Sequence, residues 1–423
     1  MPRVRWGYTL DMKKVSILGS TGSIGRQTIS VVEALPEEFQ VVGLAAGNNL
    51  DELVPQIAQH RPEVVSVGTP ELARELARRV AEGLPTGERA PEIHYGREGM
   101  LAVGTHPSAD IVVSAAVGVV GLEATYEAVK LGRTVALSNK EVLVAAGELV
   151  MAAAAKSGRE LLPVDSEHNA VHQCLRAGKR ASQQLTADSR QPLYPEVRRL
   201  VLTASGGPFR KTPLAQLAHV TVEQALNHPN WRMGNRITID SATMMNKGFE
   251  VIEARWLFDM RPEQIEVIIH PQSVVHSFVE FVDGAVLAQL APPDMRMPIQ
   301  YALTYPARVA SNQVALDWTK LRRLDFEKAS TRRFPCLRLA REALKKGGAW
   351  PCALNAADEV AVAAFLDGRL PFLGIPKVIE AVLQRTSRVK FASIQDVLAA
   401  DAEARRQAAE EVGRLAGKAA VSG

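Results

Sequence analysis

The chain has 423 residues, 47% hydrophobic and 23% charged, which is enough for roughly two or three globular domains with substantial cores. Its 50 basic and 46 acidic residues are scattered and give a net charge of only +4, which argues against a nucleic-acid-binding protein. Three cysteines without a C-x-x-C pair, no signal-peptide pattern and no membrane-length apolar run predict a cytoplasmic protein without a membrane partner.

Short apolar runs alternate with helical patterns in the first part of the chain. The expected helices include Ile24–Leu35, Leu122–Leu131 and Val142–Ala155. The expected strands are Val15–Leu18, Val41–Ala45, Val64–Val67, Ile111–Ser114, Thr134–Leu137 and Leu161–Val164. This alternation is typical of an α/β fold with a Rossmann-type parallel sheet. We therefore expect an N-terminal dinucleotide-binding domain over residues 1–164.

The pattern changes after that boundary. Strand-like runs at Val201–Ala204, Ile265–Ile269, Val274–Phe281 and Ala285–Leu290, with the hairpin signal Asp283-Gly284, predict an α+β catalytic domain over 165–304. A linker over 305–334 follows. Amphipathic stretches at Leu337–Leu344, Ala353–Leu366, Pro376–Gln384 and Ile394–Leu415 then predict a C-terminal four-helix bundle over 335–423.

A glycine-rich turn, Gly19–Gly25, directly follows the first expected strand. Glycines at i, i+3 and i+6 permit a tight turn and a close approach of backbone N–H groups to a pyrophosphate. An ordinary strand–helix turn is the alternative interpretation. The second strand ends in Gly47-Asn48-Asn49 without an acidic residue, which favours NADPH over NADH, although a basic residue is also missing there and only Arg26 is near in sequence.

Two carboxylates, Asp165 and Glu167, lie two residues apart after the strand Leu161–Val164. At a strand end both would point the same way, and like-charged carboxylates this close are costly unless they share a proton or bind a cation. Hard oxygen ligands favour Mg²⁺ or Mn²⁺. A solvated acidic strand end is the alternative.

A further group of polar residues follows in Asp240–Glu250. Asp240 or Ser241 is expected to be the N-cap of a helix that runs to Phe258. On that helix Asn246, Lys247 and Glu250 share one face, so they predict a phosphate site with a third metal carboxylate. A surface ion pair between Lys247 and Glu250 is the alternative.

Three loops complete the candidate site. Ser205–Phe209 is too rich in Gly and Pro for regular structure, and His228–Gly234 has the composition of a lid that closes over a ligand, or of a loop anchored by Trp231. Ser138–Glu141 is expected at the carboxyl edge of the sheet, where such folds bind ligands. His270 and His276 are interpreted as structural residues.

Together these motifs resemble the 1-deoxy-D-xylulose 5-phosphate reductoisomerase family of non-mevalonate isoprenoid biosynthesis. The resemblance extends from Gly19–Gly25 through Pro163–Ala170, Thr238–Glu250 and His270–Ser277 to Pro293–Pro298. It implies isomerisation and reduction of a small phosphorylated sugar, 1-deoxy-D-xylulose 5-phosphate, to 2-C-methyl-D-erythritol 4-phosphate. The implied cofactors are NADPH and a divalent cation (Mg²⁺, Mn²⁺ or Co²⁺), and the implied assembly is a homodimer.

The resemblance also implies residue roles. The metal ligands are Asp165, Glu167 and Glu250, and the catalytic residues are these three with Lys140 and His228. The substrate contacts are Lys140, Ser166, Glu167, Ser205, His228, Trp231, Ser241, Asn246, Lys247 and Glu250. The cofactor contacts are Thr21, Gly22, Ser23, Ile24, Gly47, Asn48, Asn49, Asn139, Glu141, Met233 and Gly234. The chain departs from the family at Asn48, in the polar segment 179–195 and in its N-terminal arm.

Other functions are less compatible with these residues. A semialdehyde or acyl-phosphate reductase needs a nucleophilic cysteine, and Cys174 has no convincing base partner. A non-catalytic dinucleotide sensor would not need three carboxylates beside a phosphate-binding face. A P-loop nucleotidase would carry Gly-Lys-Ser/Thr, which the chain lacks.

Overall fold

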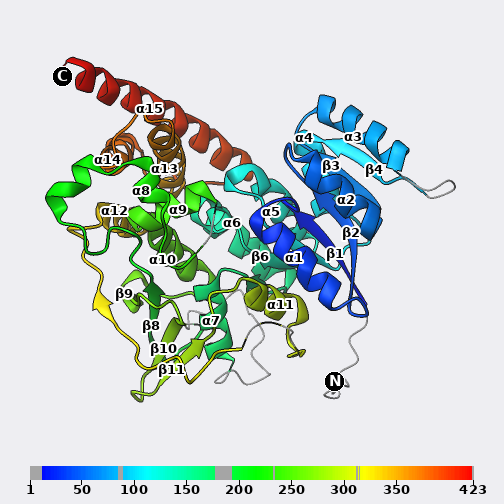
Figure 1. Cartoon of the computed structure of the whole chain (residues 1–423), viewed down its shortest axis with the longest axis horizontal. Helices are drawn as coiled ribbons and strands as arrows, with labels where there is room; N and C mark the ends of the chain where they lie inside the picture. Colours follow the sequence, from blue (N-terminus) through cyan, green and yellow to red (C-terminus); the bar gives the residue numbers. More distant parts are fainter. Residues whose placement is uncertain are drawn as a thin grey trace.

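The computed structural model describes residues 12–83, 89–176, 193–231, 234–310, 313 and 315–421. Two sheets and a group of C-terminal helices make up the fold (Figure 1). No helix among the described residues is both long and apolar enough to cross a membrane.

The first sheet is parallel and has seven strands in the order β4-β3-β2-β1-β5-β6-β7. Its strands are β1 Lys13–Leu18, β2 Phe39–Ala45, β3 Val64–Val67, β4 Glu92–Tyr95, β5 Ile111–Ser114, β6 Thr134–Leu137 and β7 Leu161–Pro163. This order confirms the predicted Rossmann-type sheet. Strand β4 was not expected because Glu-Ile-His-Tyr at the sheet edge is half exposed and has no apolar run.

Helices cover both faces of this sheet, as expected for a parallel sheet. One face packs against α1 Ser23–Ala34, α2 Leu50–His60, α3 Pro70–Gly83 and α11 Arg296–Thr304. The other face packs against α4 Gly96–Gly104, the 3₁₀ turn η1 Gly118–Gly121, α5 Leu122–Lys130 and α6 Glu141–Ser157. In Figure 1, α11 lies beside α1 although more than half of the chain separates them.

The second sheet is mixed and has five strands in the order β11-β10-β8-β9-β12. Its strands are β8 Val197–Ala204, β9 Ile265–Ile269, β10 Val275–Phe281, β11 Val286–Leu290 and β12 Glu327–Lys328. Strands β10 and β11 pair antiparallel across Asp283-Gly284, where Gly284 has φ +89°, so the hairpin prediction is confirmed. Helix α7, Ser166–Leu175, joins the two sheets and packs on β10.

Between β8 and β9 lie two 3₁₀ turns, η2 Leu214–His219 and η3 Pro262–Gln264, and three helices, α8 Val222–Leu226, α9 Asn235–Thr243 and α10 Met245–Leu257. The expected N-cap at Asp240 or Ser241 is wrong, because both residues lie inside α9. Met244, with φ +62°, ends α9 and begins α10. The break separates two helices that the sequence pattern merged into one.

The C-terminal part is helical, as predicted. It contains α12 Pro335–Lys346, α13 Trp350–Leu366, α14 Gly374–Arg385 and α15 Ile394–Val421. The four helices pack on one another, and α12 and α13 also pack on α10 and α6. One apolar core therefore runs from the first sheet through α10 into these helices.

Candidate active site

A cavity of about 800 Å³ lies between the carboxyl edge of the first sheet, the loop after β8, and α9 and α10. Most of the candidate residues that the sequence singled out line it: Gly22, Ser23, Ile24, Asn139, Lys140, Glu141, Asp165, Ser166, Glu167, Ser205, His228, Trp231, Gly234, Ser241, Asn246 and Lys247. Glu250 is fully buried behind Asn246 and Lys247. Thr21 and Gly47–Asn49 lie outside the lining, and Met233 lies outside the described residues.

The glycine turn has the tight geometry that its spacing predicts. Gly19 has φ +91°, and a Cβ on Gly25 would lie 2.2 Å from the carbonyl oxygen of Gly19. The chain can therefore make this close turn only with glycine at both positions. Gly22 is the N-cap residue of α1, and Gly22, Ser23 and Ile24 line the cavity, so the N-terminus of this helix lies at the cavity wall.

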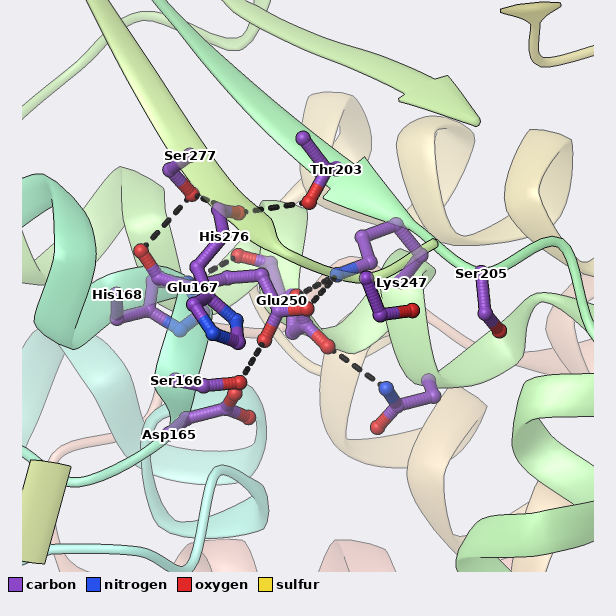
Figure 2. Close-up of polar contacts among 12 residues, drawn as sticks. Asp165, Ser166, Glu167, His168, Thr203, Ser205, Lys247, Glu250, His276 and Ser277 are labelled. Atoms are coloured by element: carbon purple, nitrogen blue, oxygen red, sulfur yellow. Dashed lines mark hydrogen bonds and ion pairs between the residues drawn. The ribbon is translucent and has the colours of Figure 1, made fainter. Parts of the chain in front are cut away.

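Three carboxylates converge on one side of the cavity. Ligand oxygens of Asp165, Glu167 and Glu250 all lie within 4.8 Å of one another. The convergence is as predicted, but its cause differs. Strand β7 ends at Pro163, Asp165 is the N-cap residue of α7, and Glu167 lies in the first turn of that helix. Helix α10 supplies Glu250, so two helices rather than a strand end bring the carboxylates together (Figure 2).

Two lysines contact these three carboxylates. The Lys140 ammonium contacts Asp165, donates to Asn246 Oδ1 at 2.8 Å and lies 3.5 Å from Glu250 Oε1. The Lys247 ammonium contacts Glu250 and lies 3.1 Å from Glu167 Oε1 (Figure 2). Asn246 also donates to Glu250 Oε1 at 2.7 Å, so the predicted shared face of α10 is confirmed.

Burial and charge shift the pKa values of these groups in opposite directions. Burial, reinforced by the charge of Glu167, raises the pKa of Glu250 to about 8. Burial also opposes ionisation of Asp165, but the Lys140 ammonium outweighs it and lowers the pKa of that carboxyl. Nearby carboxylates likewise keep the pKa of Lys140 well above its usual value despite burial. The site thus has more carboxylates than the lysines can fully compensate.

A second buried pair, His168 and Glu253, lies next to the carboxylate group. His168 Nε2 donates to the Glu250 carbonyl oxygen at 2.8 Å, and its Nδ1 lies 3.2 Å from Glu253 Oε2. Burial lowers the pKa of His168 to about 4, so the ring is neutral at physiological pH. His168 therefore orients the backbone of α10 at the residue that carries the third carboxylate.

The loop after β8 and the start of the candidate lid form a polar corner. The ring nitrogen Nδ1 of His228 accepts the backbone N–H groups of Asn230 and Trp231 at 3.2 and 3.0 Å. A neutral His228 must then carry its proton on Nε2 and donate to Ser205 Oγ at 2.9 Å. Gly207 has φ +63°, and a Cβ there would lie 2.7 Å from the Ser241 carbonyl oxygen, so the Ser205 loop packs directly on α9.

Among the residues that line the cavity but were left out of the predicted site are His276 and Arg236. His276 on β10 is buried beside Glu167, and its interpretation as purely structural missed this position (Figure 2). Arg236 on α9 lies 3.2 Å from Glu141 Oε1 and donates to Asn355 Oδ1 at 3.0 Å. Neither has a local sequence signal, because each reaches the cavity through strand pairing or helix packing. His270 instead stacks on Phe326 and does not line the cavity.

The cysteines do not support a thiol nucleophile. Cys174, Cys336 and Cys352 are all buried, and none of them lines the cavity. Burial raises the pKa of the Cys174 thiol to about 11, which disfavours the reactive thiolate.

Models of one protein family match the chain over nearly its whole length. A model described as 1-deoxy-D-xylulose 5-phosphate reductoisomerase matches residues 15–147, and models of C-terminal domains of the same family match residues 161–258 and 290–407. The chain belongs to the 1-deoxy-D-xylulose 5-phosphate reductoisomerase family. It is accordingly an NADPH-dependent reductoisomerase, an oxidoreductase that converts 1-deoxy-D-xylulose 5-phosphate to 2-C-methyl-D-erythritol 4-phosphate.

Individual reductoisomerases agree with this assignment. The enzyme of Solibacter usitatus is 51% identical over 94% of this chain and 97% of its own length. That of Geobacter metallireducens is 50% identical over 95% of this chain and 100% of its own length.

Solved structures of the family share the fold. The Zymomonas mobilis reductoisomerase in complex with NADPH has a TM-score of 0.84 and 42% identity, covering 95% of this chain and 99% of its own. A reductoisomerase in complex with NADPH, fosmidomycin and magnesium has a TM-score of 0.87 and 38% identity, covering 95% and 98%.

Proposed function

We propose that the cavity residues divide the reductoisomerase reaction among a metal site, a phosphate pocket and a dinucleotide site. The observation that carries the proposal is the convergence of Asp165, Glu167 and Glu250 within 4.8 Å beside two lysines. Solved relatives are described in complex with NADPH and magnesium, and we assign the same two cofactors to this chain.

The carboxylates suit a divalent cation. Asp165, Glu167 and Glu250 provide hard oxygen donors, and burial together with the Glu167 charge raises the pKa of Glu250, so a bound cation would favour its ionised form. A cation held there would act as a Lewis acid on adjacent oxygens of the ketose. Lys140 and Ser166 would contact the same part of the substrate, where the Lys140 ammonium stabilises negative charge that develops on oxygen.

The substrate phosphate would lie in the polar corner formed by Ser205, His228, Ser241, Asn246 and Lys247. These groups come from a loop, the lid and two helices, and the direct packing of Gly207 on α9 supports their placement in one pocket. Binding of a phosphate remote from the reacting carbons orients the substrate and draws the lid over it. Trp231 of the lid would then exclude water from the hydride transfer.

The dinucleotide would bind along the carboxyl edge of the first sheet. Thr21–Ile24 would hold the pyrophosphate at the start of α1, and Gly47–Asn49 the adenosine. Asn139, Glu141, Met233 and Gly234 would contact the nicotinamide half. Asn139 is buried, and its amide also donates to the Gly118 carbonyl oxygen at 2.8 Å. It therefore supports the turn after β5 as well.

Three finer assignments belong to the same proposal. The chain would divide into a dinucleotide-binding domain over 1–164, a catalytic domain over 165–304, a linker over 305–334 and a helical domain over 335–423. It would act as a homodimer in the cytoplasm.

The test is NADPH oxidation, followed by absorbance, with 1-deoxy-D-xylulose 5-phosphate and Mg²⁺ or Mn²⁺, repeated with EDTA. We expect consumption that depends on the metal. A folded protein that consumes NADPH equally well in EDTA would contradict the metal site, and one that consumes none with metal would contradict the activity.

A further inference from the structure

The adenosine end of the proposed dinucleotide site has no acidic residue at the end of β2. In Rossmann folds an acidic side chain there holds the ribose 2′-hydroxyl of NAD, and a nearby arginine accommodates the 2′-phosphate of NADP. Here the turn is Gly47-Asn48-Asn49, and all three residues are exposed. The asparagine amides are neutral, so the charge needed by a 2′-phosphate has to come from another element.

Arg26 lies across this turn. It belongs to the first turn of α1, and its Nη1 lies 3.8 Å from Glu52 Oε2 in the first turn of α2. Helix α2 begins directly after Asn49, and the backbone N–H of Glu52 donates to Asn49 Oδ1 at 3.1 Å. The ion pair therefore places the Arg26 guanidinium beside the exit of β2.

The Arg26 guanidinium is also available for a ligand. Its side chain is 53% exposed, and its contact with Glu52 is long. A neighbouring cation, Arg79 on α3, is engaged differently: its Nη1 lies 2.7 Å from Asp51 Oδ1 and its Nε 2.7 Å from Glu75 Oε1. Two short carboxylate contacts satisfy Arg79, whereas Arg26 retains most of its donors.

We propose that Arg26 binds the 2′-phosphate of the dinucleotide and sets the preference of this chain for NADPH over NADH. The inference rests on the proposed dinucleotide site. An arginine fork pairs well with phosphate oxygens, and such charge-assisted hydrogen bonds are stronger than neutral ones. Glu52 competes for the same guanidinium and repels the phosphate, so it weakens the preference that Arg26 creates.

The experiment measures dissociation constants for NADPH and NADH by isothermal titration calorimetry, without substrate or metal. We expect Arg26→Gln to weaken NADPH binding by about tenfold and NADH binding by less than about twofold. Glu52→Gln should tighten NADPH binding by about two- to threefold and leave NADH unchanged. Arg79→Gln is the matched control. It should leave the ratio of the NADH dissociation constant to the NADPH dissociation constant unchanged.

Several outcomes would overturn the inference. An unchanged ratio in Arg26→Gln would exclude the residue, and equal weakening of both nucleotides would place Arg26 at the shared pyrophosphate. A lower ratio in Arg79→Gln alone would assign the 2′-phosphate to α3. These failures leave NADPH binding by the unaltered chain intact, whereas an unaltered chain that binds neither nucleotide would contradict the proposed function and this inference together.

Discussion

Glu250 is the side chain whose surroundings say most about the chemistry of the cavity. It is fully buried, receives hydrogen bonds or ion pairs from Asn246, Lys247 and Lys140, and has a pKa raised to about 8. A structural carboxylate with three donors would ordinarily have a lowered pKa. Burial and the charge of Glu167 prevent this, which leaves a group whose ionisation a cation would favour.

We expect Glu250→Gln to reduce turnover by at least about 100-fold, because it removes one of three proposed metal ligands without changing the size of the side chain. The NADPH dissociation constant should change by less than about twofold. Steady-state NADPH oxidation and nucleotide titration provide the two readouts. Unchanged turnover in a folded variant would refute the metal assignment.

A substitution of Lys247 tests the proposed phosphate pocket. We expect Lys247→Met to raise the KM for the phosphorylated ketose by about tenfold or more, since it removes a charge-assisted contact to phosphate. The KM for NADPH should change by less than about twofold. Lys320→Met, at an 84% exposed position, is the control and should match the unaltered enzyme. Equal effects of Lys247→Met on both KM values would indicate a structural role.

At the scale of elements, the interface between α9 and α13 holds two buried acids that face each other. Asp240 and Asp358 are 4% and 0% exposed, and a hydrogen bond joins their side chains. Burial raises the pKa of Asp240 to about 6, although Arg236 opposes the shift. Burial and the Asp240 charge raise the pKa of Asp358 well above its usual value. Helix α9 also carries the proposed phosphate ligand Ser241. The packing of this helix on α13 therefore depends on the protonation of Asp240 and Asp358.

The sign of the pH dependence follows from these shifts. A carboxyl with a raised folded-state pKa stabilises the fold at pH below its ordinary value of 3.8 and loses that contribution as the pH rises through its raised pKa, which for Asp240 is about 6. The pKa of Asp358 is raised in the same sense, so Asp358→Asn, which cannot ionise, is expected to stabilise the protein by about 1–2 kcal/mol at pH 8 and by less at pH 5.

Thermal melts at the two pH values measure this effect, with a gain of about 1–2 °C per kcal/mol at pH 8. Glu380→Gln, at a half-exposed position on α14, serves as the control and should shift neither melt. A loss of stability in Asp358→Asn at pH 8 would mean that its charge supports the interface.

For the whole molecule, Glu359 on α13 links parts that are distant in the chain. It contacts Arg236 of α9 and Arg405 of α15, and a Cβ on Gly118 of η1 would lie 2.5 Å from its Oε1. The first sheet, the cavity and the C-terminal helices therefore meet at one carboxylate that is 15% exposed. Figure 1 shows the C-terminal helices packed over α9 and reaching toward α5 and α6.

We expect Glu359→Ala to destabilise the protein by about 1–3 kcal/mol, because two largely shielded arginines lose their shared partner. Urea unfolding followed by tryptophan fluorescence and by circular dichroism is the measurement. Both signals should shift together, since one apolar core joins these parts. Glu403→Ala, which removes a half-exposed pair with Arg406, is the control and should leave both unfolding signals unchanged. Separate shifts of the two signals would show that the helices unfold independently.

Local patterns determined much of this protein on their own. The glycine spacing in Gly19–Gly25, the apolar strands and the i, i+3 and i+4 relations of Asn246, Lys247 and Glu250 each depend on neighbours in the chain, so the sequence alone was sufficient to predict them. Only the tertiary structure decided the rest. The left-handed backbone at Met244 splits one predicted helix into two, and no sequence signal marks that conformation. The N-terminus of α7, rather than the expected strand end, positions Asp165 and Glu167. His276, Arg236 and Glu359 reach their partners across long stretches of chain, and no local spacing encodes such contacts.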